Sequence, residues 1–409
     1  MKTLFYRLQK FFGVDLAYVA RGGFWLGVDQ AAAIIISLAL TVSFANLLSQ
    51  QIYGTYRYIL SIFGILTIFT LPNMDIAVAA AVSKKLEGSL FRALKERIRW
   101  GFVGAAASLL LSGYYFFNQD QTLGAAFLIV AAFLPFTDAF NLYGAVLKGK
   151  KLFKLKSQYS VIIRAVSALA LVATLLLTSN PLLILLAFFV PYVFLRVGFF
   201  LLTIRKIPLN DSEDPRTIAY GKHLSAIQFL GALVNYLDNM LIFHYLGAAP
   251  LAVYAIAMAP ITKVQQAFSV IPELAMPKFS ARPLSETKAF LIKKILKALI
   301  FTAAGVGAYF LIAPPVFNLF FPKYFESVFY SQLLSLLLLA LPFSLIYTMF
   351  QSQALKSHLY RYNIAIRVFQ LVLVIILVPL YGIVGAIFAR IIFQVFSVAV
   401  LLVLFRSAK

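Results

Sequence analysis

The amino-acid sequence predicts an all-α polytopic membrane protein, and three observations support this fold class. The chain of 409 residues is 62% hydrophobic and only 12% charged, which is more apolar surface than a soluble protein of this length can bury. Apolar runs of about 20 residues, long enough to cross a hydrocarbon core, recur along the chain. Basic residues gather in short clusters between these runs. We expect about twelve transmembrane helices in two six-helix lobes, related by a pseudo-two-fold axis along the membrane normal.

The apolar runs divide the chain into a lead-in, two lobes, a linker and a tail. A basic, aromatic segment over 1–23 is expected to lie along the inner membrane face. The N-lobe (24–204) is expected to contain spans at 24–47, 54–82, 100–117, 122–147, 157–178 and 182–204. The C-lobe (223–405) is expected to contain spans at 223–246, 250–276, 293–317, 328–355, 362–379 and 382–405. A cytoplasmic linker over 205–222 joins the lobes, and 406–409 form a cytoplasmic tail.

The distribution of basic residues predicts the orientation. With the N-terminus inside, the inner segments hold 29 of the 36 Lys and Arg residues, whereas the outer loops hold only Lys323. This asymmetry follows the positive-inside rule and predicts a multi-pass protein of the cytoplasmic (inner) membrane with both termini cytoplasmic. The formal net charge of +22 therefore reflects membrane topology, and nucleic acid is not an expected partner.

The sequence offers little for catalysis. The chain contains no cysteine, and its three histidines are far apart, so neither a thiolate nor a His-rich metal site is expected. A near-match to a phosphate-binding loop, from Gly144 to Lys150, lacks the following Ser or Thr and ends a membrane helix. The loops are all short, with no room for a soluble catalytic domain. We expect a protein that is not an enzyme and has no resident cofactor.

An internal repeat supports the division into two halves. The stretch from Leu48 to Tyr56 aligns without gaps with the stretch from Leu246 to Tyr254, at an offset of 198 residues. The tripeptides at 71–73 and 271–273 are separated by nearly the same distance. Two halves of six helices enter the membrane in the same direction, as in transporters built from parallel repeats.

Charged residues within the expected spans are the candidates for function, because each costs roughly 2.5–3.5 kcal/mol at the centre of a helix. The basic ones are Arg57, Arg164, Arg196, Lys263, Arg367 and Arg390, and the acidic ones are Asp29, Asp75, Asp138, Asp238 and Glu273. For Arg164, Arg196, Arg367 and Arg390, snorkelling or a structural ion pair competes with a functional role. Lys263, at the middle of its helix, favours function. Together, cations facing a cavity would bind an anion such as a phosphate or diphosphate.

Three acids are candidates for coupling transport to an ion gradient. Asp238, within Tyr236-Leu237-Asp238-Asn239, would bind Na⁺ or a proton, or else pair with a cavity arginine. Asp29 and Asp75 lie nearer the cytoplasmic side, where the same two alternatives are open.

Two segments resemble a known family. The run Gly23-Phe24-Trp25-Leu26-Gly27, followed by the stretch from Leu47 to Tyr56, is similar to the start of bacterial O-antigen and oligosaccharide flippases. These belong to the multidrug/oligosaccharidyl-lipid/polysaccharide exporter (MOP) superfamily. The segment from Tyr236 to Asn239, the stretch Leu246 to Ala257, and Pro277-Lys278-Phe279-Ser280 resemble their second half. The resemblance implies two six-helix lobes, a cationic central cavity, and a polyprenyl-diphosphate-linked oligosaccharide as substrate.

The expected function is therefore a flippase that moves such a lipid from the cytoplasmic to the outer leaflet by alternating access, for synthesis of an O-antigen-like polysaccharide. The expected substrate-binding residues are Arg21, at the cytoplasmic mouth, and Arg57, Arg164, Arg196, Lys263, Arg367 and Arg390. Membrane lipids and other polysaccharide-assembly membrane proteins are the further partners. One alternative is a cation-coupled multidrug exporter of the same superfamily. A second is a membrane-embedded glycosyltransferase or polymerase, against which the short outer loops argue.

Overall fold

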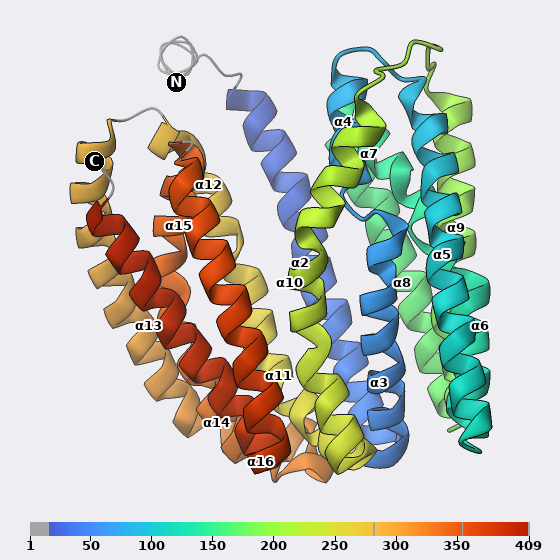
Figure 1. The fold of residues 1–409 in the computed structure, drawn as a ribbon, viewed down its shortest axis with the longest axis vertical. Coiled ribbons are helices and arrows are strands. Elements are labelled where there is room, and N and C mark those ends of the chain that lie inside the picture. Colours follow the sequence, from blue (N-terminus) through green and yellow to red (C-terminus); the bar gives the residue numbers. More distant parts are fainter. Residues whose placement is uncertain (1–15, 281–282, 354, 408–409) are drawn as a thin grey trace. The chain divides into compact units, whose positions relative to one another are not determined.

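The structure, a computed structural model, describes residues 16–280, 283–353 and 355–407. Over these ranges every regular element is a helix, either α or 3-10 (Figure 1). In the part of the chain so described, ten helices are long and apolar enough to cross a membrane. The longest of them, Ser357–Ser407, contains two of the expected spans, and α11 supplies a further apolar segment of 21 residues. The predicted all-helical, polytopic fold class is confirmed.

The chain divides into two compact units. One contains residues up to Leu40 together with 63–229, and the other contains 41–62 and 230–409. The first unit holds most of α2 (Leu16–Leu47), and then η1 (Thr67–Thr70), α4 (Met74–Ser83), α5 (Ser89–Phe117), α6 (Gln121–Thr137), η2 (Ala139–Asn141), α7 (Leu142–Gly149), α8 (Phe153–Leu177) and α9 (Pro181–Lys206). The residue boundaries predicted for the N-lobe, linker and C-lobe remain predictions.

The second unit holds most of α3 (Gln50–Leu66) and the C-terminal half of α10 (Thr217–Leu246). The elements after it are α11 (Ala248–Phe268), α12 (Val270–Ser280), α13 (Leu284–Phe320), η3 (Pro322–Tyr324), α14 (Ser327–Ser335), η4 (Leu336–Phe343), α15 (Ser344–Ser352) and α16 (Lys356–Ser407). Residues 16–23 of the expected lead-in form the start of α2, and residues 1–15 lie outside the described residues, so the place of this segment along the membrane face stays a prediction.

The second expected span is interrupted at Leu71 and Pro72. Leu71 adopts a left-handed conformation with φ of 54°, which ends η1, and α4 begins three residues later at Met74. Carbonyl groups freed by such a break need donors inside a membrane protein. Arg97 of α5, which is 1% exposed, donates to the carbonyls of Leu71 and Pro72 at 2.8–3.2 Å and to that of Asp138 at 2.9 Å.

This role corrects the prediction for 84–99, which treated Arg97 as one of a set of basic residues in a cytoplasmic loop. The third helix begins at Ser89 and not near residue 100, so four of those basic residues are helical. The charge pattern did not reveal the helix start at Ser89, since the polar first turns of a membrane helix resemble a loop in sequence. Arg97 is buried because the two interrupted helices beside it require hydrogen-bond donors.

The loop after α4 and the linker after α9 pack on each other within the first unit. The Glu87 carboxylate, 3% exposed at the side chain, accepts from Lys150 Nζ at 2.5 Å and from the backbone N–H of Asn210 at 3.3 Å. Gly88 is a close-approach position, because a Cβ there would lie 2.5 Å from the Asp211 carbonyl oxygen. The positive charges at this end of the unit are thus partly neutralised by a buried carboxylate.

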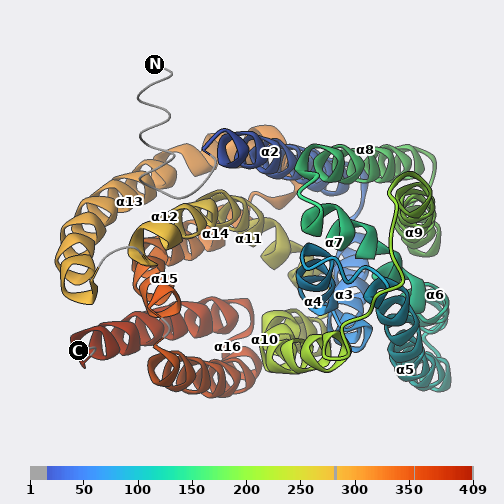
Figure 2. The same ribbon diagram turned by 90° about the horizontal axis from the view of Figure 1, so that it is seen from above.

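The long helix α16 is two antiparallel helices joined by a tight turn. Gly382 has φ of 60° and ψ of −134°, so the helix reverses there, as Figures 1 and 2 show for the two red arms. The Tyr362 and Ser397 hydroxyls lie 2.7 Å apart, and the Phe369 and Phe396 rings are 4.0 Å apart between centroids. The predicted boundary between spans 362–379 and 382–405 is confirmed.

The internal repeat also has a structural counterpart. Helix α3 begins at Gln50 and α11 begins at Ala248, the same offset of 198 residues that aligns the two stretches. Within the second unit these segments meet closely, because a Cβ at Gly54 would lie 1.8 Å from the Ala248 carbonyl oxygen. Only glycine permits this contact. Tyr56 and Tyr254, the last residues of the two stretches, are both buried.

Candidate functional site

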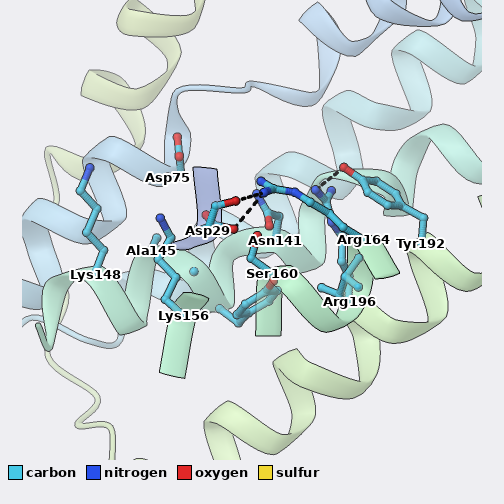
Figure 3. Close-up of a pocket in the computed structure, with 13 residues that line it drawn as sticks. Asp29, Asp75, Asn141, Ala145, Lys148, Lys156, Ser160, Arg164, Tyr192 and Arg196 are labelled. Carbon is cyan, nitrogen blue, oxygen red and sulfur yellow. Dashed lines mark hydrogen bonds and ion pairs between the residues drawn. The ribbon is translucent and has the colours of Figure 1, made fainter. Parts of the chain in front are cut away.

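A polar cavity of about 240 Å³ lies inside the first unit, lined by residues of six helical segments, α2, α4, η2, α7, α8 and α9 (Figure 3). Four of its lining residues were candidates from the sequence: Asp29 on α2, Asp75 on α4, Arg164 on α8 and Arg196 on α9. Other polar side chains that complete the lining are Asn141, Tyr143, Lys148, Lys156, Ser160 and Tyr192. Tertiary structure thus gathers charges that are up to 167 positions apart in the chain.

Arg196 is held rigidly in the cavity wall. Its Nη1 donates to the Thr137 carbonyl at 2.5 Å and to Asp138 Oδ1 at 3.1 Å, and its Nη2 donates to the Tyr192 hydroxyl. The guanidinium carbon also lies 3.9 Å from the centroid of the Tyr192 ring. The side chain is 11% exposed. Arg196 therefore supplies a fixed positive charge whose hydrogen bonds are largely committed to the protein.

Arg164 is bound more loosely. Its Nη1 donates to the Asp29 carboxylate at 2.9 Å and to the Asp29 carbonyl at 3.0 Å. The side chains of Arg164 and Asp29 are 37% and 17% exposed, so the ion pair is open to the cavity side. Ion pairs of this exposure exchange readily with other anions, because solvent screens the attraction and the remaining guanidinium donors are free.

Three charged side chains in the cavity have no hydrogen bond or ion pair within the described ranges. They are Lys148, Lys156 and Asp75. The Lys156 chain passes beside Gly144, where a Cβ would lie 3.7 Å from the lysine Cε. Because a lysine ammonium offers three donors, Lys156 is available to a ligand.

In the second unit, Asp238 forms a buried network with two other helices. Arg390 of α16 donates to Asp238 Oδ2 through Nη2 at 2.5 Å and Nε at 2.7 Å, and the Tyr254 hydroxyl of α11 donates at 2.6 Å. Asp238 is 2% exposed. Of the two alternatives for this acid, the structure has the arginine pair.

Three more cations of the second unit have no anionic partner among the described side chains. Arg57 on α3 lies close enough to Lys263 on α11 for the two positive charges to repel each other, and the Arg57 Nε is buried without a hydrogen-bond partner. The Arg367 guanidinium packs over Gly231 of α10, where a Cβ would lie 3.3 Å from Nη2. Excess positive charge of this kind is costly in a membrane unless an anion compensates it.

Some candidates and contacts were out of reach of the sequence. The side chains of Arg21 and Glu273 lie outside the described part of the structure. Lys148 and Lys156 counted only as cytoplasmic loop charges, although their place beside an apolar run was visible. Tyr192 gave no signal as an isolated tyrosine, and Tyr254 stood out only as part of the repeat. Over the described ranges, no group of three His, Cys, Asp or Glu side chains is placed to hold a metal ion.

Comparison with known proteins finds similarity in fold and not in sequence. No protein-family model and no curated protein matches the chain. The solved structure of the lipid II flippase MurJ in an inward closed conformation is similar, with a TM-score of 0.67 and 16% identity over 94% of this chain and 87% of that one. The MATE multidrug transporter DinF-BH has a TM-score of 0.66 and 11% identity, covering 96% of this chain and 95% of that one.

A third structure, of MATE in complex with MaD5, has a TM-score of 0.65 and 14% identity, covering 95% of both chains. A further match is a multidrug resistance MATE family transporter of the MOP superfamily. These likenesses establish the fold: an all-helical polytopic membrane protein with two lobes, built like MATE transporters and MurJ. The resemblance to the MOP superfamily is thus confirmed for the fold, and the O-antigen flippase family remains a proposal.

Proposed function

We propose that the protein is a transporter that moves a polyprenyl-diphosphate-linked oligosaccharide from the cytoplasmic to the outer leaflet by alternating access. The observation that carries the proposal is how the charges within the membrane helices are paired. Arginines neutralise three carboxylates, those of Asp29, Asp138 and Asp238. Several cations of these helices have no ion-pair partner among the described side chains, including Lys148, Lys156, Arg57, Lys263 and Arg367.

This balance favours an anionic substrate. A transporter of cationic drugs needs carboxylates free to meet the drug, whereas the free charges here are mostly positive. A diphosphate bears several oxygen acceptors and compensates several cations at once. The proposed substrate needs no covalent step, so the side chains have only to bind, orient and release it.

One observation favours the second candidate, a cation-coupled multidrug exporter. Asp75 lines the cavity of the first unit without an ion-pair partner among the described residues. A free carboxylate in such a place would meet a proton, Na⁺ or a cationic drug. A coupling role of Asp75 is equally compatible with the flippase, in which it would bind the driving ion.

The test is leaflet exchange in liposomes that contain the purified protein and a fluorescent polyprenyl-diphosphate oligosaccharide, scored with an impermeant quencher. We expect Lys263→Gln and Arg367→Gln to slow exchange by about ten- to hundredfold, because each removes a charge-assisted hydrogen bond. Arg406→Gln, at the exposed end of the same helix as Arg367, is the matched control and should leave exchange unchanged.

Two results would contradict the proposal. One is the absence of exchange for several sugar lipids together with efflux of a cationic dye, which would favour the drug exporter. The other is exchange that stays as fast in Lys263→Gln and Arg367→Gln as in the control, because cations without a role in binding are dispensable.

A further inference from the structure

Two hollows of opposite character lie on adjacent faces of the same pair of helices, α2 and α8. The polar cavity uses Asp29 from α2 and Lys156, Ser160 and Arg164 from α8. An open apolar groove of about 430 Å³ uses Trp25 and Val28 from α2 and residues between 157 and 162 of α8. Both hollows lie within the first unit.

We propose that the seam between α2 and α8 is the loading site for the lipid substrate, with its diphosphate in the polar cavity and the start of its prenyl chain in the apolar groove. This inference rests on the proposed function and adds the place and the side chains that bind the lipid first. The occupant of the groove is the chain of the same molecule whose phosphates bind in the cavity.

The cavity has the size and charge for the diphosphate. Its volume of about 240 Å³ is below the range of roughly 300–1,000 Å³ typical of pockets for drug-sized ligands, so it suits the phosphates and not a whole oligosaccharide. Four cations and two carboxylates line it, an excess of two positive charges. Ser160 and Asn141 add neutral hydrogen-bonding groups for phosphate oxygens.

The groove has the chemistry for an isoprenoid chain. Its lining exposes mainly apolar atoms, and Ile162 on its wall is 44% exposed. Few residues of helix α2 are buried by protein, 11% of those in its most apolar stretch, so lipid chains have access to it. At its end, Lys154 Nζ lies 5.5 Å from the centroid of the Trp25 ring, which adds a cation near the expected headgroup level.

The contacts that close the seam are of a kind that a phosphate can replace. The Ser157 hydroxyl donates to the Trp25 carbonyl at 2.9 Å, and Arg164 joins Asp29 through the exposed ion pair. A diphosphate that approaches along the seam would accept from Arg164 in place of Asp29 and would then meet Lys156. Arg196, held by Thr137, Asp138 and Tyr192, stays in place as a fixed positive charge.

The experiment uses the full chain in nanodiscs with a prenyl diphosphate that carries a diazirine in the first isoprene units. Photocrosslinks should map to α2 near Trp25 and Val28 and to α8 near Ile162. Unlabelled prenyl diphosphate should compete for them, whereas inorganic diphosphate should compete weakly and prenyl alcohol hardly at all. Strong competition by inorganic diphosphate would mean a site for a free anion and would overturn the assignment of the groove.

Substitutions give two effects of opposite sign. Lys156→Gln should weaken probe binding by about ten- to hundredfold, because one charge-assisted contact is lost. Asp29→Asn should tighten binding, since Arg164 then has no competing carboxylate, and a general folding defect would not produce tighter binding. Ile162→Trp should fill the groove and weaken binding. Leu169→Trp, two turns along the same face and 70% exposed, is its control.

The outcome separates this inference from the proposed function. Leaflet exchange that proceeds while the probe crosslinks only to helices of the second unit would overturn the loading site and leave the flippase standing. A lack of both exchange and crosslinking would overturn both proposals.

Discussion

The network of Asp238, Tyr254 and Arg390 is expected to hold three helices of the second unit together, and its disruption should be measurable as lost stability. Arg390→Met leaves a carboxylate that is 2% exposed with only the Tyr254 hydroxyl and the Asn239 backbone N–H as donors. Removing one partner of a buried ion pair typically costs about 3–5 kcal/mol, and we expect a loss in that range.

The other substitutions should cost less. Asp238→Asn leaves Arg390, whose side chain is 24% exposed and so less buried than Asp238, and we expect about 2–3 kcal/mol. Tyr254→Phe removes one hydrogen bond to a charged group, worth about 1.5–3 kcal/mol. Tyr56→Phe is the matched control, because Tyr56 occupies the same repeat position, is buried, and forms none of the described hydrogen bonds. Its substitution should change stability little.

The assay is a double-mutant cycle of Asp238→Asn and Arg390→Met, with the free energy of unfolding measured by SDS titration of the purified protein in detergent micelles. The double variant should lose much less than the sum of the single losses, since no unpaired buried charge is left. Losses that add within about 0.5 kcal/mol would refute the reasoning. Additive losses together with stabilisation of the wild-type protein by Na⁺ would point to an ion site at Asp238 instead.

Two further predictions concern the first unit. Arg97→Leu should lower the free energy of unfolding by about 2–5 kcal/mol in the same titration, because it leaves buried carbonyl groups at two helix breaks without donors. Arg99, which is exposed on the same helix, is the control, and Arg99→Leu should change the free energy of unfolding little. Equal losses in the two variants would contradict the role of Arg97. The Lys150 ammonium holds the pKa of Glu87 below its usual value of 4.5, so the pair should stabilise the fold fully above that pH and lose its contribution as the pH falls through the lower, folded-state pKa. The unfolding temperature should therefore fall less steeply between neutral pH and about pH 3 for Glu87→Gln than for the wild-type protein. The same change at the exposed Glu213 should leave the pH dependence of the unfolding temperature as it is in the wild-type protein.

The sequence alone determined the class of fold. Apolar runs near the length of a bilayer, separated by short basic loops, allow only membrane helices, since lipid leaves no other partner for backbone groups. The turn at Gly382 and the equivalent starts of α3 and α11 were also predictable, because a break in hydropathy and a repeat are local patterns. The intramembrane charges were visible as a set for the same reason.

Only the tertiary structure decided which of those charges pair and which stay free. The partners of Asp29, Asp138 and Asp238 lie 135, 58 and 152 residues away in the chain, and no local pattern encodes such distances. In the sequence Lys156 resembled the other cytoplasmic charges, and only the packing of the helices places its side chain in a cavity. Arg97 looked like a loop residue until two interrupted helices needed its donors. Packing makes these assignments because a buried polar group is stable only where the fold places a partner beside it.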